Sequence, residues 1–149
     1  MRAIVQRVMQ AEVTADGRSL GKIGQGFVIL LGVGRGDTEA DADYILDRVI
    51  GLRVFADAAG KMNLALGAVG GSLLIFSQFT LHADTSQRRP SFTGAAPPDE
   101  ALRLYDYLLS RARLRDVTVE SGKFGAEMQL HLVNDGPVTI ILDSRLHGG

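Results

Sequence analysis

A group of polar side chains follows an apolar segment near the middle of the chain. Residues 73–79 form an apolar run of the kind that is typical of a buried β-strand, and Ser77, Gln78 and Thr80 lie at its end. Hydroxyl and amide groups, together with exposed backbone N–H groups at a strand end, can bind a carbonyl group and stabilise an oxyanion. The residue types therefore permit acyl-transfer chemistry at residues 77–84.

The same residues also fit a strand terminus without any catalytic role. Ser77 and Thr80 are suited to capping the turn that follows the strand. No general base accompanies the two hydroxyls in the sequence, and His82 could serve as one only if the turn folds it back. The residues alone leave the catalytic and the capping interpretations open.

A second polar cluster, Asn-Asp-Gly-Pro-Val-Thr, occupies residues 134–139. Its composition predicts a hairpin loop that joins strands at 128–133 and 138–142. The Asp-Gly pair would supply positive φ angles, and the proline would stand where no ladder donor is needed.

Several classes of site are excluded by what the sequence lacks. The chain has no cysteine, so it has no disulfide, thiolate zinc site or iron–sulfur cluster. Residues 17–22 are one residue short of a P-loop, and residues 32–36 lack the G-x-G-x-x-G spacing. The histidines are too widely separated for a ligand pair; they are His82, His131 and His147. We therefore expect no metal and no cofactor.

Length and composition indicate one soluble domain. The chain has 149 residues, of which 46% are hydrophobic, and its formal net charge is −1. The longest apolar run, residues 27–33, is far shorter than the roughly 20 residues that span a bilayer, and no signal peptide is apparent. We expect a cytoplasmic protein that has no membrane partner.

The order of the predicted elements favours an α+β fold. Asp16-Gly17 predicts a hairpin turn between strands at 3–14 and 18–23, and Asp37-Thr38 and Pro98 begin two amphipathic helices. The second helix is predicted to present Leu102, Tyr105, Leu109 and Ala112 on one face. Further strands are predicted at 27–33, 73–79, 117–120, 128–133 and 138–142. We expect a single domain over residues 1–149, with a mainly antiparallel or mixed, barrel-like sheet, two main helices packed on it, and a flexible tail at 144–149.

Taken together, residues 77–84 and 134–139 resemble the two signature motifs of the D-aminoacyl-tRNA deacylase family. The resemblance extends through Gln6-Arg7-Val8 and residues 30–33, 60–64 and 89–92. It implies a homodimer that hydrolyses the ester between a D-amino acid, or mischarged glycine, and the terminal adenosine of tRNA. It also implies a pocket at the subunit interface, which a cis Gly136-Pro137 pair enters from the partner subunit.

The resemblance assigns a role to each motif. Ser77, Gln78, Phe79 and Thr80 would form the catalytic segment, in which the N–H groups of Phe79 and Thr80 hold the ester oxyanion. The adenosine 2′-hydroxyl would help to activate water, and Thr80 as a covalent nucleophile is the rival mechanism. The resemblance implies that chiral selection would be carried by Asn134, Gly136, Pro137 and Ala83.

The net charge gives no sign of a nucleic-acid partner, so contacts with tRNA must be local. Arg88, Arg89 and Phe92 are the candidates for holding the 3′ end, the arginines by phosphate contacts and Phe92 by stacking. Further candidate phosphate contacts are Arg2, Arg7, Arg111, Arg113 and Arg115. No DNA partner is expected. The alternatives are a non-catalytic RNA-binding module and an oligomeric structural protein.

Overall fold

A strongly curved mixed sheet forms the centre of the computed structural model, which describes residues 1–146. Its strands are β1 (Arg2–Ala15), β2 (Arg18–Ile23), β3 (Gly26–Gly32), β6 (Ser72–Ser77), β7 (Thr118–Ser121) and β8 (Gln129–Asp143). The order is β2-β1-β3-β6-β7, and β8 also pairs with β1. The β3–β6 and β6–β7 pairs are parallel and the pairs made by β1 are antiparallel.

The two ends of this strand order approach each other. A Cβ added to Gly21 of β2 would lie 3.1 Å from Cβ of Glu120 in β7. The sheet therefore curls into a nearly closed barrel, which reduces its exposed edges. The predicted barrel-like mixed sheet with two helices is confirmed.

The turn between β1 and β2 has the predicted chemistry. Asp16 has a φ of 50° and Gly17 a φ of 74°, so both residues of the Asp-Gly pair adopt the positive φ that a tight hairpin requires. The hairpin prediction is confirmed.

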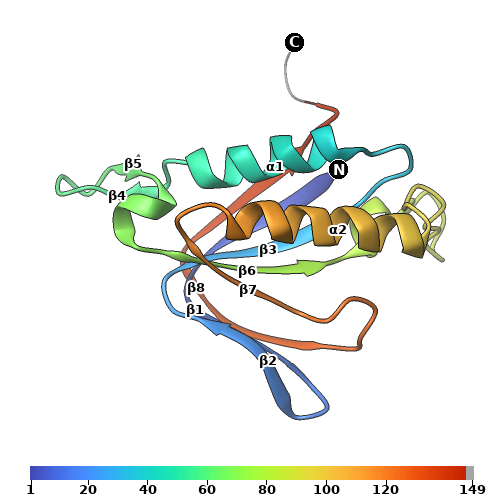
Figure 1. The fold of residues 1–149 in the computed structure, drawn as a ribbon, viewed down its shortest axis with the longest axis horizontal. Helices are drawn as coiled ribbons and strands as arrows, with labels where there is room; N and C mark the ends of the chain where they lie inside the picture. Colours follow the sequence, from blue (N-terminus) through green and yellow to red (C-terminus); the bar gives the residue numbers. More distant parts are fainter. Residues whose placement is uncertain (147–149) are drawn as a thin grey trace.

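Both helices pack on one side of the sheet (Figure 1). Helix α1 (Glu39–Gly51) begins with a capping box between Thr38 and Asp41, and α2 (Pro98–Arg113) begins with proline at its first position. The buried face of α2 comprises Ala101, Leu104, Tyr105, Leu108, Leu109 and Ala112. Leu102 is 38% exposed, so its predicted place on this face is wrong: at about 100° per residue it lies at the edge of the buried face, beyond Leu109 and far from Leu104.

Strands β3 and β6 are buried on both faces. Phe27, Ile29 and Leu31 face the helices, whereas Val28 packs in a second cluster inside the curl of the sheet, with Phe76. Tyr105 joins α2 to β6, because its hydroxyl donates to the carbonyl of Ile75 at 3.0 Å. Burial raises the pKa of Tyr105 to about 12, so the phenol stays a neutral donor.

A small hairpin and a short 3₁₀ helix follow α1. They are β4 (Phe55–Ala56), β5 (Met62–Leu64) and η1 (Leu66–Val69). Phe55 packs against Phe27 of the central sheet, with 5.1 Å between the ring centroids. This contact joins the hairpin to the core.

The last part of the sheet differs from the prediction. Residues 129–143 form one strand, β8, which pairs with β1 from Thr14–Gln129 to Arg2–Asp143. The hairpin loop predicted at 134–137 is wrong, because both halves of β8 pair with the same long strand and the chain need not reverse. The register shifts on either side of Val8, opposite Asn134, show that this segment is a bulge, where a proline is tolerated.

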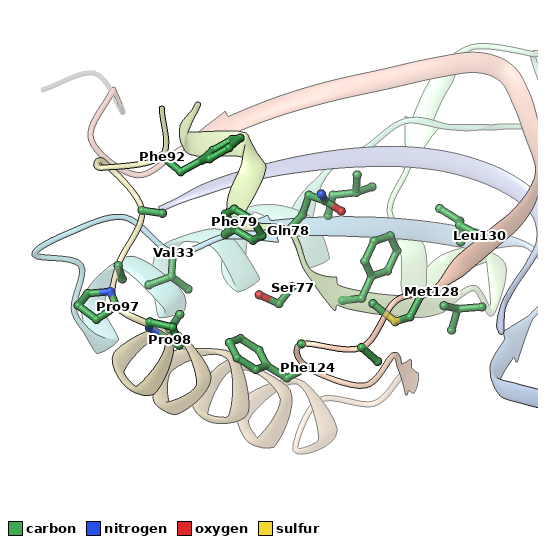
Figure 2. A pocket seen from close by; sticks show the side chains of 18 of the residues that line it. Val33, Ser77, Gln78, Phe79, Phe92, Pro97, Pro98, Phe124, Met128 and Leu130 are labelled. Carbon is green, nitrogen blue, oxygen red and sulfur yellow. The ribbon is translucent and has the colours of Figure 1, made fainter. Parts of the chain in front are cut away.

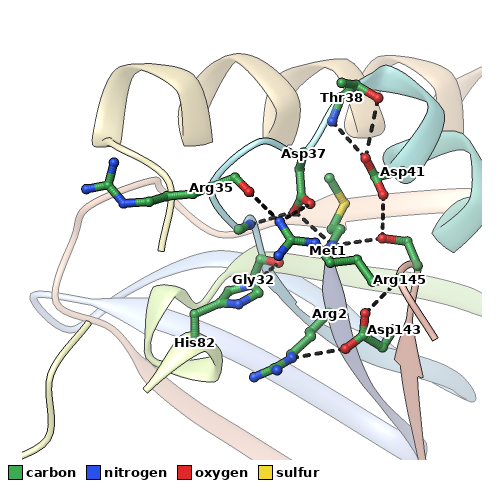
Figure 3. Close-up of polar contacts among 12 residues, drawn as sticks. Met1, Arg2, Gly32, Arg35, Asp37, Thr38, Asp41, His82, Asp143 and Arg145 are labelled. Atoms are coloured by element: carbon green, nitrogen blue, oxygen red, sulfur yellow. Dashed lines mark hydrogen bonds and ion pairs between the residues drawn. The ribbon is translucent and has the colours of Figure 1, made fainter. Parts of the chain in front are cut away.

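The prediction of a flexible tail at 144–149 is wrong for its first two residues. Ser144 is 3% exposed, accepts a hydrogen bond from the Met1 ammonium group at 2.8 Å and donates to Asp41 at 2.6 Å. Arg145 forms an ion pair with Asp37 at 3.0 Å (Figure 3). Residues 144 and 145 thus anchor the end of β8, and 147–149, with His147, lie outside the described residues. Within residues 1–146, no helix is long and apolar enough to cross a membrane.

Candidate active site

The segment after β6 turns sharply and leaves two backbone donors free. Strand β6 ends at Ser77, two residues earlier than predicted, and Phe79 begins the short 3₁₀ helix η2 (Phe79–His82). The N–H of Gln78 donates to the carbonyl of Leu31 at 2.7 Å, and that of Leu81 donates to Gln78 at 3.2 Å. The N–H groups of Phe79 and Thr80 have no hydrogen-bond acceptor in the described part of the chain. Adjacent N–H groups of this kind can stabilise an oxyanion.

A cavity of about 770 Å³ opens beside this turn (Figure 2). Ser77, Gln78 and Phe79 form part of its wall. The opposite walls are mainly apolar and include Val33, Pro97, Pro98, Phe124, Met128 and Leu130. Its size falls within the range of small-molecule sites, which are typically about 300 to 1,000 Å³.

The long loop between η2 and α2 supplies a wall of this cavity. Phe92 packs edge to face on Phe79, with 5.2 Å between ring centroids, and Phe79 remains 55% exposed. The loop is held by β-bridges between Asp84 and Ser91 and between Gly34 and Ala95. The aromatic pair therefore lies at the boundary between the cavity and solvent.

Among the described residues, no general base lies beside the Thr80 hydroxyl. It accepts a hydrogen bond from the Gln78 amide at 2.5 Å, while the His82 ring is hydrogen-bonded to the carbonyl of Gly32 at 2.9 Å. Hydrogen bonds from the backbone N–H and hydroxyl of Ser86 lower the pKa of Asp84, which makes that carboxylate a weak base. His82 is thus not turned toward the hydroxyls as a Ser/His hydrolase would require.

The bulge at 134–137 is held by the side chain of one arginine, Arg7. The guanidinium of Arg7 donates to the carbonyl of Asp135 at 3.2 Å, forms an ion pair with its carboxylate at 3.3 Å and also donates to the carbonyl of Val54. The Gly136–Pro137 peptide bond is cis, and Gly136 has a φ of +115°. Gly136 and Pro137 are exposed.

The two motifs do not share a cavity within one chain. The cavity wall, as far as residues 1–146 define it, includes Ser77, Gln78 and Phe79 but none of Asn134, Gly136 and Pro137. Thr80 and Ala83 also lie outside it, and the N–H of Ala83 donates to the carbonyl of Thr80 at 3.2 Å.

The candidate RNA-contacting arginines fall into two groups. Arg2, Arg7, Arg111 and Arg115 each form an ion pair with an aspartate, which occupies part of their charge. Arg113, in the last turn of α2, is exposed and has no carboxylate partner in the described structure. Arg88 and Arg89, in the long loop, are likewise exposed and unpaired among the described residues. Phe92 follows them along the same loop and reaches the cavity.

Sequence reasoning missed part of the cavity wall. Arg35, Phe124 and Met128 line the cavity, although none belongs to either motif. Phe124 and Met128 come from an aperiodic segment between β7 and β8, and its glycines at 122 and 125 were the only local signal of irregular structure. In residues 1–146 no group of three or more His, Asp or Glu side chains could hold a metal ion.

This fold and this cavity define a class: a small α+β protein that presents two free backbone donors at the end of a mainly apolar pocket. Comparison with known proteins gives the family. Residues 4–143 match the model of the family described as D-Tyr-tRNA(Tyr) deacylase. The chain therefore belongs to this family of hydrolases.

Similar proteins cover nearly the whole chain. A protein of Paracidovorax citrulli named D-aminoacyl-tRNA deacylase is 55% identical over 95% of this chain and 92% of its own length. One of the same name from Lacticaseibacillus casei is 54% identical over 97% of this chain and 98% of its own.

Solved structures share the fold. One titled "c-Myc DNA Unwinding Element Binding Protein" matches with a TM-score of 0.91 and 38% identity, over 96% of this chain and 98% of that one. Another, titled as a probable eukaryotic D-amino acid tRNA deacylase, matches with a TM-score of 0.80 over 95% of this chain and 97% of that one. Its 16% identity supports the fold alone.

Proposed function

We propose that this protein hydrolyses the ester bond of D-aminoacyl-tRNA, and of glycine mischarged onto tRNA, in the cytoplasm. The observation that carries the proposal is the pair of free N–H groups on Phe79 and Thr80 beside a nucleoside-sized cavity. The named activity of relatives that are more than 50% identical over almost the full length supports the substrate class.

The proposed chemistry uses the backbone rather than a side-chain nucleophile. Water attacks the ester carbonyl carbon, the N–H groups of Phe79 and Thr80 stabilise the oxyanion, and the bond to the ribose oxygen then breaks. The ribose 2′-hydroxyl helps to activate the water, while Ser77 and Gln78 position the turn. The absence of a base near Thr80 among the described residues favours this route over a Thr80 nucleophile.

Chiral selection is assigned to Gly136 and Pro137, with Asn134 and Ala83 as supporting residues. Backbone groups in a bulge held by Arg7 form a stiffer selector than rotating side chains. Such a selector excludes the side chain of an L-amino acid by steric contact, and glycine passes because it has no side chain.

A second copy of the chain would supply this selector to the cavity. Gly136 and Pro137 lie outside the wall of the cavity beside Phe79, as residues 1–146 define it, and the exposed apolar residues Met9, Val133 and Ile141 lie on the same strands, β1 and β8. Large exposed apolar side chains on paired strands are candidates for an interface. The active site is therefore proposed to form between two subunits, with Arg88, Arg89 and Phe92 contacting the tRNA 3′ end.

The function is tested by measuring deacylation of matched D- and L-aminoacyl-tRNA and of glycyl-tRNA. We expect hydrolysis of the D- and glycyl-esters and none of the L-ester. A protein that binds tRNA but leaves all the esters intact would be a non-catalytic RNA-binding module, and one that does neither would be a structural protein.

The subunit arrangement is tested by measuring molar mass by light scattering and activity across the same dilution series. We expect activity to fall together with the dimer fraction, because each cavity would lose its selector. A fully active monomer would contradict the proposed arrangement.

A further inference from the structure

Arg35 lies in the turn after β3 and forms part of the cavity wall. Its backbone is fixed on both sides: the N–H donates to the carbonyl of Gly94 at 3.0 Å, and the carbonyl accepts a hydrogen bond from Arg145. Its side chain points away from the cluster of Asp37, Met1 and Arg145 (Figure 3). The main chain of Arg35 is therefore held, while its side chain takes no part in that cluster.

The guanidinium of Arg35 is anchored but carries an uncompensated charge. Its Nε donates to the carbonyl of Thr93, and no carboxylate in the described part of the chain forms an ion pair with it. Arg103, by contrast, is paired with Glu39 and Glu100, and Arg145 with Asp37. The Nη1 and Nη2 groups of Arg35 thus remain available as donors beside a mainly apolar cavity.

This arrangement suits a phosphate group. A guanidinium presents several N–H donors in a planar fork that matches phosphate oxygens, and a hydrogen bond from Nε to a backbone carbonyl limits the rotamers lost on binding. The exposed position keeps the charge hydrated in the free protein, so no buried unpaired charge has to be tolerated.

We infer that Arg35 binds the 5′-phosphate of the 3′-terminal nucleotide of the tRNA. The inference rests on the proposed function, in which the terminal adenosine enters the cavity with its ester at Phe79 and Thr80. The phosphate is the one charged group of that nucleotide, and Arg35 is the only cationic side chain in the wall of this cavity as residues 1–146 define it. Arg88 and Arg89 are then left for phosphates nearer the body of the tRNA.

The test compares two small substrates that carry D-tyrosine as an ester on the ribose 3′-oxygen. One is D-tyrosyl-adenosine, and the other is the same ester with a phosphate added at the 5′ position, D-tyrosyl-adenosine 5′-monophosphate. For the wild-type dimer we expect a lower KM for the phosphorylated ester. In Arg35→Gln, KM for that ester should rise about 10- to 100-fold, the loss typical of one charge-assisted hydrogen-bonded contact. KM for D-tyrosyl-adenosine and kcat for both esters should stay within about twofold.

Two variants control for charge and for folding. Arg18→Gln removes the same charge from the β2 end of the β1–β2 hairpin, outside the wall of this cavity as the described residues define it, and should change neither KM. Arg35→Lys keeps the charge without the planar fork and should retain part of the preference for the phosphorylated ester. With full-length tRNA, Arg35→Gln should reduce the slope of log KM against log salt by about one.

A binding measurement separates this inference from the proposed function. Calorimetric titration of adenosine and adenosine 5′-monophosphate into wild type and Arg35→Gln requires no hydrolysis. A phosphate preference that Arg35→Gln abolishes supports the phosphate site even if no ester is cleaved, in which case the proposed function alone fails. Equal affinity of the wild type for the two ligands, or an equal effect of Arg35→Gln on both esters, would overturn the inference.

Discussion

The turn at 77–82 and the bulge at 134–137 both interrupt regular β-structure, yet they do so in different surroundings. The turn ends a strand that is buried on both faces, and its free N–H groups lie beside a cavity made by the same chain. The bulge interrupts an exposed strand in the middle of its pairing with β1, and within residues 1–146 it lies outside the wall of that cavity. The turn offers backbone hydrogen-bond donors of the kind that can bind an ester carbonyl, whereas the bulge offers an exposed backbone surface fixed by Arg7.

Different forces hold the two regions. Backbone hydrogen bonds from Gln78 and Leu81, a hydrogen bond from Arg2 to the Leu81 carbonyl, and the His82 contact with Gly32 fix the turn, and none of residues 77–82 forms an ion pair in the described structure. The bulge depends on Arg7, whose side chain is 12% exposed and links Asp135 to Val54. The turn should therefore tolerate changes in its side chains, and the bulge should not.

Gly136→Ala should produce the largest effect. An added Cβ would lie 2.9 Å from Nη2 of Arg7 and 3.0 Å from Cγ2 of Val138, at a φ of +115° that a side chain disfavours. The bulge must shift, and a misplacement of about 1 Å can cost about 100-fold in rate, so kcat/KM for D-aminoacyl-tRNA should fall about 100-fold.

Gly60→Ala is the matched control for that variant. Gly60 also has a positive φ, +77°, but its added Cβ would meet nothing within 4 Å. It should lose about 1 kcal/mol of stability and keep its activity. If Gly136→Ala folds, dimerises and deacylates like Gly60→Ala, the bulge has no role in the reaction.

Arg7→Gln should produce a smaller effect through the same region. The carbonyl of Val54 and the carboxylate of Asp135 lose their partner, which costs about 1 to 3 kcal/mol of stability and loosens the bulge. We expect about a tenfold fall in kcat/KM, together with weaker discrimination between D- and L-esters. Arg103→Gln, which removes an exposed arginine paired on the helices, should leave both quantities unchanged.

Thr80→Ala tests the tolerance of the turn. The variant keeps the backbone N–H, so we expect less than a tenfold loss of kcat, whereas a substrate with a 2′-deoxy terminal adenosine should react about 100-fold more slowly. Single-turnover kinetics and mass spectrometry of the quenched reaction give both answers. Complete inactivity of a folded Thr80→Ala, or an acyl group trapped on Thr80, would favour the nucleophile mechanism.

The smallest expected effect concerns the end of β8, the strand that carries the bulge. Burial alone would raise the pKa of Asp41, but hydrogen bonds from Ser144 and the Thr38 backbone, with the nearby Met1 ammonium, lower it below its usual value. Because the folded-state pKa is depressed, this stabilisation is present above the unfolded pKa of about 3.9 and is lost as pH falls through the folded value.

Ser144→Ala tests this contribution. The unfolding free energy of the wild type should fall as the pH drops from about 5 to about 3. In Ser144→Ala this fall should be smaller by about 0.5 kcal/mol, a low value because solvent screens the partly exposed carboxylate of Asp41. Urea unfolding at several pH values measures it. An unchanged acid-side slope would show that Ser144 does not set the titration of Asp41.

The elements and one of the two motifs could be placed from the sequence because their signals are local. Asp16-Gly17 determined a hairpin turn, Thr38 and Pro98 marked helix starts, and the apolar run before Ser77 marked a strand end. The error at 134–137 has a physical reason: Asp-Gly-Pro suits a hairpin and a bulge equally, and only the distant strand β1 decides which one forms.

The sequence by itself determined the α+β class, the order of most strands and helices, and the two motifs that mark the family, because turn chemistry, capping and apolar periodicity act over a few residues. The tertiary structure alone decided which groups meet. Arg7 and Asp135, Phe79 and Phe92, and Asp41 and Ser144 are brought together by sheet register and loop path. It likewise decided that Arg35 shares a cavity with Ser77, since a cavity belongs to several elements at once and no local pattern encodes it.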